Sequence, residues 1–302
     1  MATTFADLIE ECFSYLLSYG SSRDKVTSLN ATVNATDTTF TVADGRQIDR
    51  GFLEMDSELM AVNSVDINTG IVMLHPWGRG ARGTVAATHA TNTMVVASPR
   101  FPRSRVKAEI LQVVNNLYPE LFSVAIDESN TVNAAQVTYP LPADARSIVG
   151  IRYQTTGPSK MWAPVTRYYM DQNADVTAFP TGKSLDIYGA MQPGRIMKIR
   201  YRREFNDFQA ETDTFASVFL SEDWRDIIRL NVVGRILMGL EPARLELDSI
   251  ESVNRSATAG AGVQPTAAAT VGKQFLALAL VRLGEERRRL LNQYPSTQVR
   301  MS

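Results

Sequence analysis

The feature of this chain that most constrains its fold is an alternation between helix-patterned and strand-patterned segments. Apolar residues recur at helical spacing in segments at about 4–19, 102–123, 218–240 and 272–293. Short strand and turn patterns fill 26–98 and 130–210. Because a chain that returns repeatedly to helical segments can pack them together, we expect an α+β protein. Its predicted architecture is a helical body of about four helices, assembled from separated segments, with two inserted β-rich modules, each a small barrel or sandwich.

The same pattern predicts how the chain is divided. The expected parts are an N-terminal helix (1–25), a first β module (26–99), a second helical segment (100–124), a second β-rich module (125–214), C-terminal helices (215–295) and a C-terminal tail (296–302). Residues 254–272 are rich in Ala, Gly, Ser and Thr, so we expect a flexible connector there. The tail after Pro295 is short and is not expected to be ordered by itself.

Local signals place the ends of the helices. Thr4 and Asp7 stand in the capping-box relation, so the first helix is expected to begin beside Thr4. Pro119 either ends the second helix early or kinks it. The hydroxyl of Ser221 can cap the third helix, and the acidic residues that follow favour the positive end of the helix dipole.

Composition narrows the classes of function. The chain carries 31 basic and 32 acidic residues and a formal net charge of −1, whereas a dedicated nucleic-acid binder usually has a marked basic excess. DNA is therefore not expected as the main partner. The single cysteine, Cys12, excludes an intramolecular disulfide and is expected to be a buried core thiol, with a reactive thiol as the alternative.

Neither a membrane span nor a leader is expected. The longest clearly apolar run, Phe275 to Val281, is far shorter than the roughly 20 residues that a transmembrane helix needs. Asp7, Glu10 and Glu11 stand where a signal peptide would carry positive charge. We therefore expect a protein that is made and assembled in a host cytoplasm and has no membrane partner.

The residues that carry most enzyme chemistry are sparse and form no recognisable motif. The two histidines, His75 and His89, fit neither HExxH nor a CxxC zinc pattern, and there is no GxSxG elbow. The glycines of 78–83 do not match a GxxxxGK[ST] loop, so close turns are expected there. The acidic residues from Asp44 to Glu58 lack the order of a calcium loop and are interpreted as a solvated face. We expect no catalytic, cofactor-binding or metal-binding residue and predict that the protein is not an enzyme.

Two basic clusters have alternative interpretations. The members of the first, around the start of the second helix, are Arg100, Arg103, Arg105 and Lys107. The members of the second, which alternate with apolar residues in a predicted strand, are Arg195, Lys198, Arg200, Arg202 and Arg203. Each cluster can pair with acidic neighbours, meet phosphate or form an ordinary charged surface.

Motifs in two parts of the chain carry a family resemblance. Those of the first part are Phe40-Thr41-Val42-x-Asp44-Gly45, Gly51 with Glu58-Leu59-Met60-x-Val62, and Arg79-Gly80-x-x-Gly83-Thr84-x-Ala86-x-x-His89. With these, the stretch from Phe40 to Val96 resembles a module that recurs in virion proteins of tailed bacteriophages. The C-terminal third, in which Phe219-Leu220-Ser221-Glu222-Asp223-Trp224 leads into a helix, is similar to head-to-tail adaptor proteins, also called connector or neck proteins.

The resemblance implies a structural adaptor in the neck or tail region of a virion. Such a protein forms a homo-oligomeric ring, of twelve copies, under the portal protein, joins capsid to tail and lets DNA pass without sequence-specific binding. Tail-tube, nozzle or fibre proteins would be further partners. By the same resemblance the C-terminal segment docks on the portal, and the residues implied are Arg287, Arg288, Arg289, Tyr294, Gln298, Val299 and Arg300. No cofactor is implied.

Two rival hypotheses belong to other classes. The first is a tail or collar protein that binds fibres, a receptor or a glycan through its β modules. It requires an exposed aromatic platform, for which the candidates are Trp77, Trp162, Tyr168 and Tyr169. The second is an enzyme such as a wall hydrolase, which requires paired carboxylates in a cleft, and the sequence shows no local pattern for such a pair.

Overall fold

The computed structural model describes residues 2–18, 24–155, 161–189, 191–239 and 267–295. By its internal contacts the chain divides into two units. One comprises residues 1–2, 114–227 and 279–302, and the other comprises residues 3–113 and 228–278. Each unit is described by itself below.

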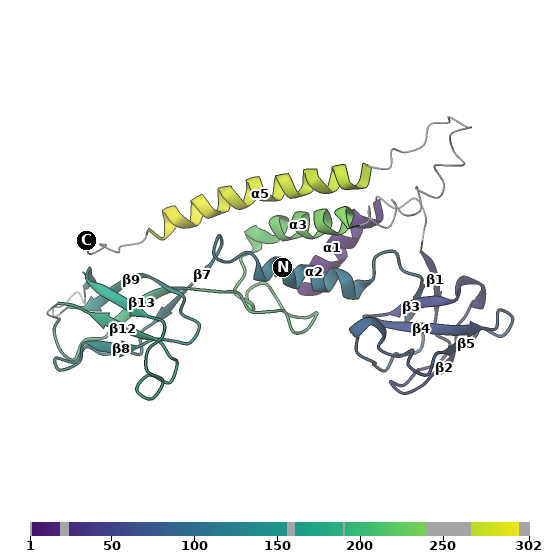
Figure 1. Ribbon diagram of the computed structural model, residues 1–302, viewed down its shortest axis with the longest axis horizontal. Helices are drawn as coiled ribbons and strands as arrows, with labels where there is room; N and C mark the ends of the chain where they lie inside the picture. The colour runs from purple at the N-terminus through teal and green to yellow at the C-terminus, as the bar shows by residue number, and fades with distance from the viewer. Residues whose placement is uncertain (1, 19–23, 156–160, 190, 240–266, 296–302) are drawn as a thin grey trace. The chain divides into compact units, whose positions relative to one another are not determined.

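The expected helical body with two inserted β modules is wrong. The described chain is mixed and strand-rich, with 13 strands in three antiparallel sheets, one of them a half-barrel, and a helical C-terminus (Figure 1). The physical reason lies in the cores. One hydrophobic cluster is built entirely from residues between Leu29 and Ala97, and another entirely from residues between Val132 and Tyr201. The strand-rich segments therefore bury their own apolar residues and are not appendages of a helical core.

The N-terminal β region, residues 24–98, is one six-stranded antiparallel sheet with the strand order β1-β6-β3-β4-β5-β2. Its strands are β1 (Lys25–Ser28), β2 (Thr39–Thr41), β3 (Gly51–Met55), β4 (Glu58–Val65), β5 (Ile71–Leu74) and β6 (Met94–Ala97). Alternation decides which side chains enter the core: on β5, Val72 and Leu74 are buried, whereas Ile71 and Met73 are exposed. The core is completed by residues such as Phe40 and Leu53.

The central β region, residues 123–208, contains two antiparallel sheets with the orders β10-β9-β13-β7 and β11-β12-β8. Their strands are β7 (Ser123–Asp127), β8 (Thr138–Pro140), β9 (Ser147–Gln154), β10 (Trp162–Val165), β11 (Tyr168–Asp171), β12 (Ser184–Ile187) and β13 (Met197–Arg203). Both sheets contribute to one core, in which Leu185 of β12 belongs to the same cluster as Ile199 of β13. The predicted alternation of β13 is confirmed, because Met197, Ile199 and Tyr201 are buried and the basic residues between them are half-buried.

The helices are α1 (Phe5–Ser18), α2 (Arg103–Asn115), α3 (Arg225–Met238) and α5 (Ala267–Gln293). The capping box of α1 is confirmed: the Asp7 N–H donates to Thr4 Oγ1 over 3.1 Å and the Thr4 N–H donates to the Asp7 carboxylate over 2.9 Å. Cys12 is buried on this helix, as predicted, and burial raises the pKa of its thiol to about 12. Of the two possibilities for Pro119, the first holds: the second predicted helix ends early, because α2 stops at Asn115.

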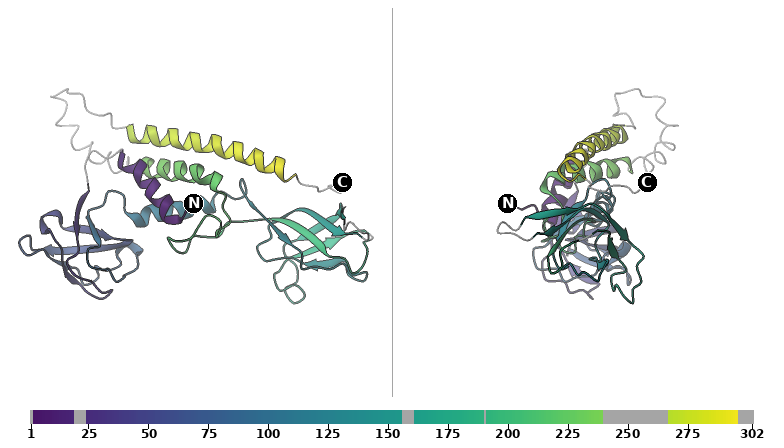
Figure 2. Two further views of the ribbon diagram at one scale, coloured as in Figure 1. Left: turned by 180° about the vertical axis from the view of Figure 1, so that it is seen from behind. Right: turned by 90° about the vertical axis from the view of Figure 1, so that its left-hand side faces the viewer.

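A pair of glycines brings α3 and α5 together. A Cβ added to Gly272 would lie 2.8 Å from the Gly234 carbonyl oxygen, and one added to Gly234 would lie 2.9 Å from the Gly272 carbonyl oxygen. The two backbones therefore meet where neither residue has a side chain, and both views of Figure 2 show the helices side by side.

The structure changes the predicted extent of α5. Residues 267–272, which were interpreted as part of a flexible connector, belong to this helix. The remainder of that connector, 254–266, and the predicted tail, 296–302, lie outside the described residues. Among the helices that are described, none combines the length and the apolar character needed to cross a membrane.

Candidate functional site

Of the predicted docking residues, three arginines lie in the C-terminal half of α5 and Tyr294 follows it. Arg287 pairs with Glu120 over 2.8 Å, and Arg289 pairs with Asp223 over 2.5 Å. Arg288 is exposed, and Tyr294 is half-buried just after the helix. Gln298, Val299 and Arg300 lie outside the described residues. The structure therefore assigns two of the three arginines to ion pairs within their own unit.

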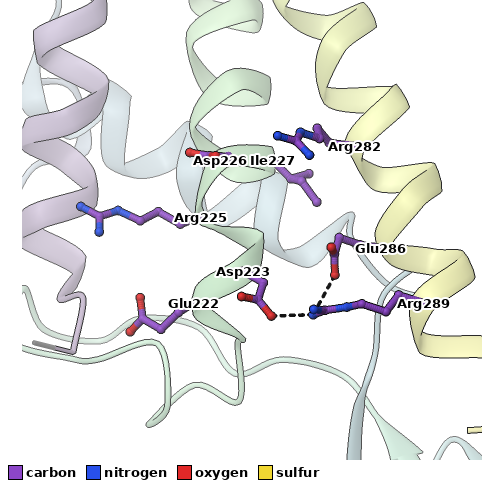
Figure 3. Close-up of a pocket in the computed structure, with 8 residues that line it drawn as sticks. All are labelled: Glu222, Asp223, Arg225, Asp226, Ile227, Arg282, Glu286 and Arg289. Atoms are coloured by element: carbon purple, nitrogen blue, oxygen red, sulfur yellow. Dashed lines mark hydrogen bonds and ion pairs between the residues drawn. The ribbon is translucent and has the colours of Figure 1, made fainter. Parts of the chain in front are cut away.

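A charged hollow of about 410 Å³ separates the C-terminal half of α5 from the start of α3 (Figure 3). Its charged residues are Glu222, Asp223, Asp226, Glu286, Arg225, Arg282 and Arg289. The sequence positions Asp223 directly, because Ser221 Oγ accepts the Asp223 N–H at the turn that precedes α3. Figure 3 shows Arg289 reaching from α5 toward Asp223 and Glu286, while Arg225 and Glu222 lie on the far side of α3.

The electrostatic interactions of this hollow centre on Arg289. The Arg289 guanidinium lies 2.5 Å from Asp223 and 2.9 Å from Glu286. The hydrogen bond from Arg289 lowers the pKa of Asp223, and the same bond raises the pKa of Arg289. The ion pair between Arg289 and Asp223 therefore ties α5 to the turn that precedes α3.

The outward side of α5 carries a row of exposed apolar side chains. Leu280 is 65% exposed, Val281 58% and Leu291 40%, and Gly284 stands between them at helical spacing. Ala279 and Leu290 on the opposite side are buried. A helix that is apolar on both its packed and its exposed side is typical of a protein–protein interface. We call Leu280, Val281 and Leu291 the α5 row.

The motif residues of the N-terminal β region meet in one buried network. Glu58 is 2% exposed, and Arg79 donates to its carboxylate from Nε over 2.8 Å and from Nη2 over 2.9 Å. The backbone N–H groups of Gly80 and Ala87 donate to the same carboxylate, each over 2.9 Å. His89 Nε2 lies 2.9 Å from it. These residues therefore fix a loop onto β4.

This network corrects part of the sequence interpretation. The acidic residues from Asp44 to Glu58 were interpreted as a solvated face, but Glu54 and Glu58 are buried. Glu54 accepts the Arg103 N–H over 2.6 Å and so caps α2 from β3. The close turns expected at 78–83 are confirmed, since Gly80 and Gly83 have φ of 58° and 82°. We did not predict that Glu58 accepts hydrogen bonds from several segments of the chain. The only sequence signal for this role was its place in the motif.

The second basic cluster is used within its own unit. Lys198 pairs with Glu128 over 2.6 Å and lies 4.6 Å from the centre of the Trp162 ring. The Arg202 guanidinium lies 4.1 Å from the centre of the Phe122 ring. Pairing with an acidic neighbour, one of the three interpretations for this cluster, therefore holds for Lys198. Arg202 instead stacks on an aromatic ring.

The aromatic platform required by the receptor-binding rival is incomplete. Tyr168 is only 8% exposed, whereas Tyr169 is 58% and Trp77 67% exposed. Trp77 stacks on His75, with ring centres 4.9 Å apart, and belongs to a different unit from Trp162 and Tyr169. Trp162 is half-buried beneath Lys198. Tyr168 cannot contribute a face to an exposed platform.

Comparison with known proteins adds no relative. Neither protein-family models nor curated proteins nor solved structures gave a match to this chain.

Proposed function

We propose that this chain is a non-enzymatic structural adaptor of a tailed phage virion. In this proposal its copies form a ring of twelve under the portal protein, join the capsid to the tail and let DNA pass. The observation that carries the proposal is the α5 row, because an assembly protein needs an apolar face that another subunit covers.

The row suits contact with a neighbouring copy of the chain. Burying a leucine or valine side chain contributes about 1.5–3 kcal/mol, so covering Leu280, Val281 and Leu291 would offset a substantial part of the entropy that association loses. Arg288 is exposed on the same helix and offers a polar contact at the rim. The partner that we assign to the row is the next subunit of the ring.

The N-terminal β region supports the proposal in a second way. Its motif residues Arg79, Gly80 and His89 hold a loop in place through Glu58. Residues that serve the fold of a module can recur wherever the module recurs, whatever it is attached to. In this proposal, the resemblance of Phe40 to Val96 to a virion module rests on residues that hold the fold of the module.

The deciding experiment is electron cryomicroscopy of purified virions that contain this protein. The expected result is density for the chain in a ring directly beneath the portal, with α5 of one subunit against its neighbour. Density at the distal tail would favour a receptor- or fibre-binding protein instead. Absence of the chain from the particle would overturn the proposal altogether.

A further inference from the structure

A hollow of about 450 Å³ beside the N-terminal β region is lined by three arginines and by no carboxylate. Arg82 comes from the loop before β6, Arg100 from the segment that enters α2, and Arg105 from the first turns of α2. Thr84 and Ser104 add hydroxyl groups to the lining. All of these residues belong to one unit.

The first basic cluster of the sequence is divided by the fold. Arg103 pairs with Glu10 over 2.5 Å, and the Lys107 ammonium donates to Ser57 over 2.5 Å. Arg100 and Arg105 line the hollow instead. In the part of the chain that the structure describes, no ion pair is formed by Arg82, Arg100 or Arg105. The carboxylates of the described residues therefore do not neutralise the positive charge of the hollow.

Aromatic rings hold two of the guanidinium groups without cancelling their charge. Arg82 lies 4.2 Å from the centre of the Phe52 ring, and Arg100 lies 5.5 Å from the centre of the Phe101 ring. Such contacts orient a guanidinium and leave its N–H groups free for another acceptor. The hollow thus has positioned donors before any ligand arrives.

The backbone around Arg82 is also fixed. Arg82 has φ of 54°, a conformation that costs a residue with a side chain about 1–2 kcal/mol. Thr84 holds the loop there, because its Oγ1 accepts the Leu59 N–H over 3.0 Å and donates to the Ala81 carbonyl over 2.9 Å. Backbone strain that persists in a rigid setting is a common property of binding sites.

We propose that this hollow binds a phosphate group. Guanidinium groups match phosphate oxygens with paired hydrogen bonds. The volume admits one phosphate with its immediate substituent, so recognition would not depend on nucleotide sequence. The source is either a free phosphate or the phosphate backbone of a nucleic acid, and the inference does not depend on the adaptor function.

The test is calorimetric titration of the full chain at low salt with inorganic phosphate, with pyrophosphate and with a single-stranded thymidine oligonucleotide. The test variant is R82Q/R100Q/R105Q. The control variant is Arg50→Gln, which removes the same kind of charge from an exposed position of the same β region that does not line the hollow. Thermal unfolding of each variant shows that it is folded.

We expect saturable binding to the wild type and to the control, and a loss of at least roughly tenfold in affinity in the triple variant, as removal of charge-assisted hydrogen bonds predicts. Binding of pyrophosphate alone would identify a small phosphate as the ligand. Binding of the oligonucleotide, with an affinity that falls as salt rises, would identify a nucleic-acid backbone. Equal affinities of wild type and triple variant, no binding of any phosphate at millimolar concentration, or binding of polyglutamate in their place would overturn the proposal.

Discussion

His89 Nε2 lies 2.9 Å from Glu58 Oε2, and both side chains are about 1% exposed. On its other side, His89 Nδ1 lies 2.8 Å from Asp56, whose side chain is 65% exposed. The imidazole therefore connects a buried carboxylate to an exposed one across the loop that follows β5. This arrangement makes Glu58 the residue on which the N-terminal β region most depends.

Replacing Glu58 with Gln should strongly destabilise the N-terminal β region. The amide cannot accept all the donors that Arg79, Gly80 and Ala87 direct at the carboxylate, and it leaves the Arg79 charge buried. Breaking a buried pair from one side typically costs about 3–5 kcal/mol. Urea unfolding measures this loss. The matched control is Asp49→Asn, which breaks the exposed pair with Lys25 and should cost less than about 1 kcal/mol; equal effects of the two variants would contradict the prediction.

Stability should fall in acid because of the same carboxylate. Burial disfavours the charge of Glu58, but the hydrogen bonds from Arg79, Ala87 and His89 outweigh it and lower the pKa to about 2. The folded state therefore binds fewer protons than the unfolded state between about pH 4.5 and pH 2. The stabilisation, about 3 kcal/mol at 1.36 kcal/mol per pKa unit, is complete above this window and is lost as pH falls through it. Unfolding curves recorded between pH 5 and 2 should show this loss in the wild type and not in Glu58→Gln.

Glu54 should give the opposite pH dependence. Burial raises its pKa to about 7, although the α2 N–H groups of Arg103 and Ser104 favour its charged form. The folded state therefore binds more protons than the unfolded state between about pH 4.5 and 7, and stability falls as pH rises through that window. Glu54→Gln keeps an oxygen that can accept the Arg103 N–H and removes the titration. Thermal unfolding of both proteins should show a slope between pH 5 and 7 in the wild type alone.

Two glycines of α5 should respond oppositely to alanine. In Gly272→Ala the new methyl group would lie 2.8 Å from the Gly234 carbonyl oxygen, so the helices must separate, at a cost of about 1–3 kcal/mol. In Gly284→Ala no atom lies within 4 Å of the new methyl group, and higher helix propensity should stabilise the protein by up to about 1 kcal/mol. Calorimetric melting temperatures distinguish the two, and a Gly272→Ala variant as stable as the wild type would argue against close packing of α3 on α5.

The α5 row should be needed for assembly and not for folding. Leu280→Glu places a charge on a side chain that is already 65% exposed, so unfolding of the isolated protein should change little. Its incorporation into virions should fall severely, because a charge would be buried at the subunit contact. Val85→Glu, at an 81% exposed position of the N-terminal β region, is the control. If Leu280→Glu protein enters particles as the wild type does, the row is not an interface.

The sequence predicted local structure better than architecture. The Thr4–Asp7 capping box and the alternation of β13 involve residues close together in the chain, so their spacing alone predicts the geometry. The helical body was wrong because helical period does not show what a helix packs against. Strand pairing over long separations, such as β1 with β6 and β6 with β3, closes the core of the N-terminal β region, and no local pattern indicates such pairing.

The same limit applies to the candidate sites. The sequence singled out the basic residues around Arg103 and left their roles open, because chain position does not show which arginines face a carboxylate. Only the fold separates Arg103, which meets Glu10, from Arg100 and Arg105, which share a hollow with Arg82. For the C-terminal arginines the resemblance implied one docking surface, and the structure distributes them among Glu120, Asp223 and the exposed side of α5.

The Arg79 side chain ties three separate segments together. Besides Glu58 on β4, it donates to the carbonyls of Asn34 and Asp37 and to that of Ala87. Both ends of the loop from Gly80 to Ala87 are thus anchored to the sheet, while Val85 at its tip is 81% exposed. A foreign peptide inserted beside Val85 would have rigid attachment points at both ends of the loop, which makes this loop a natural place to display an epitope.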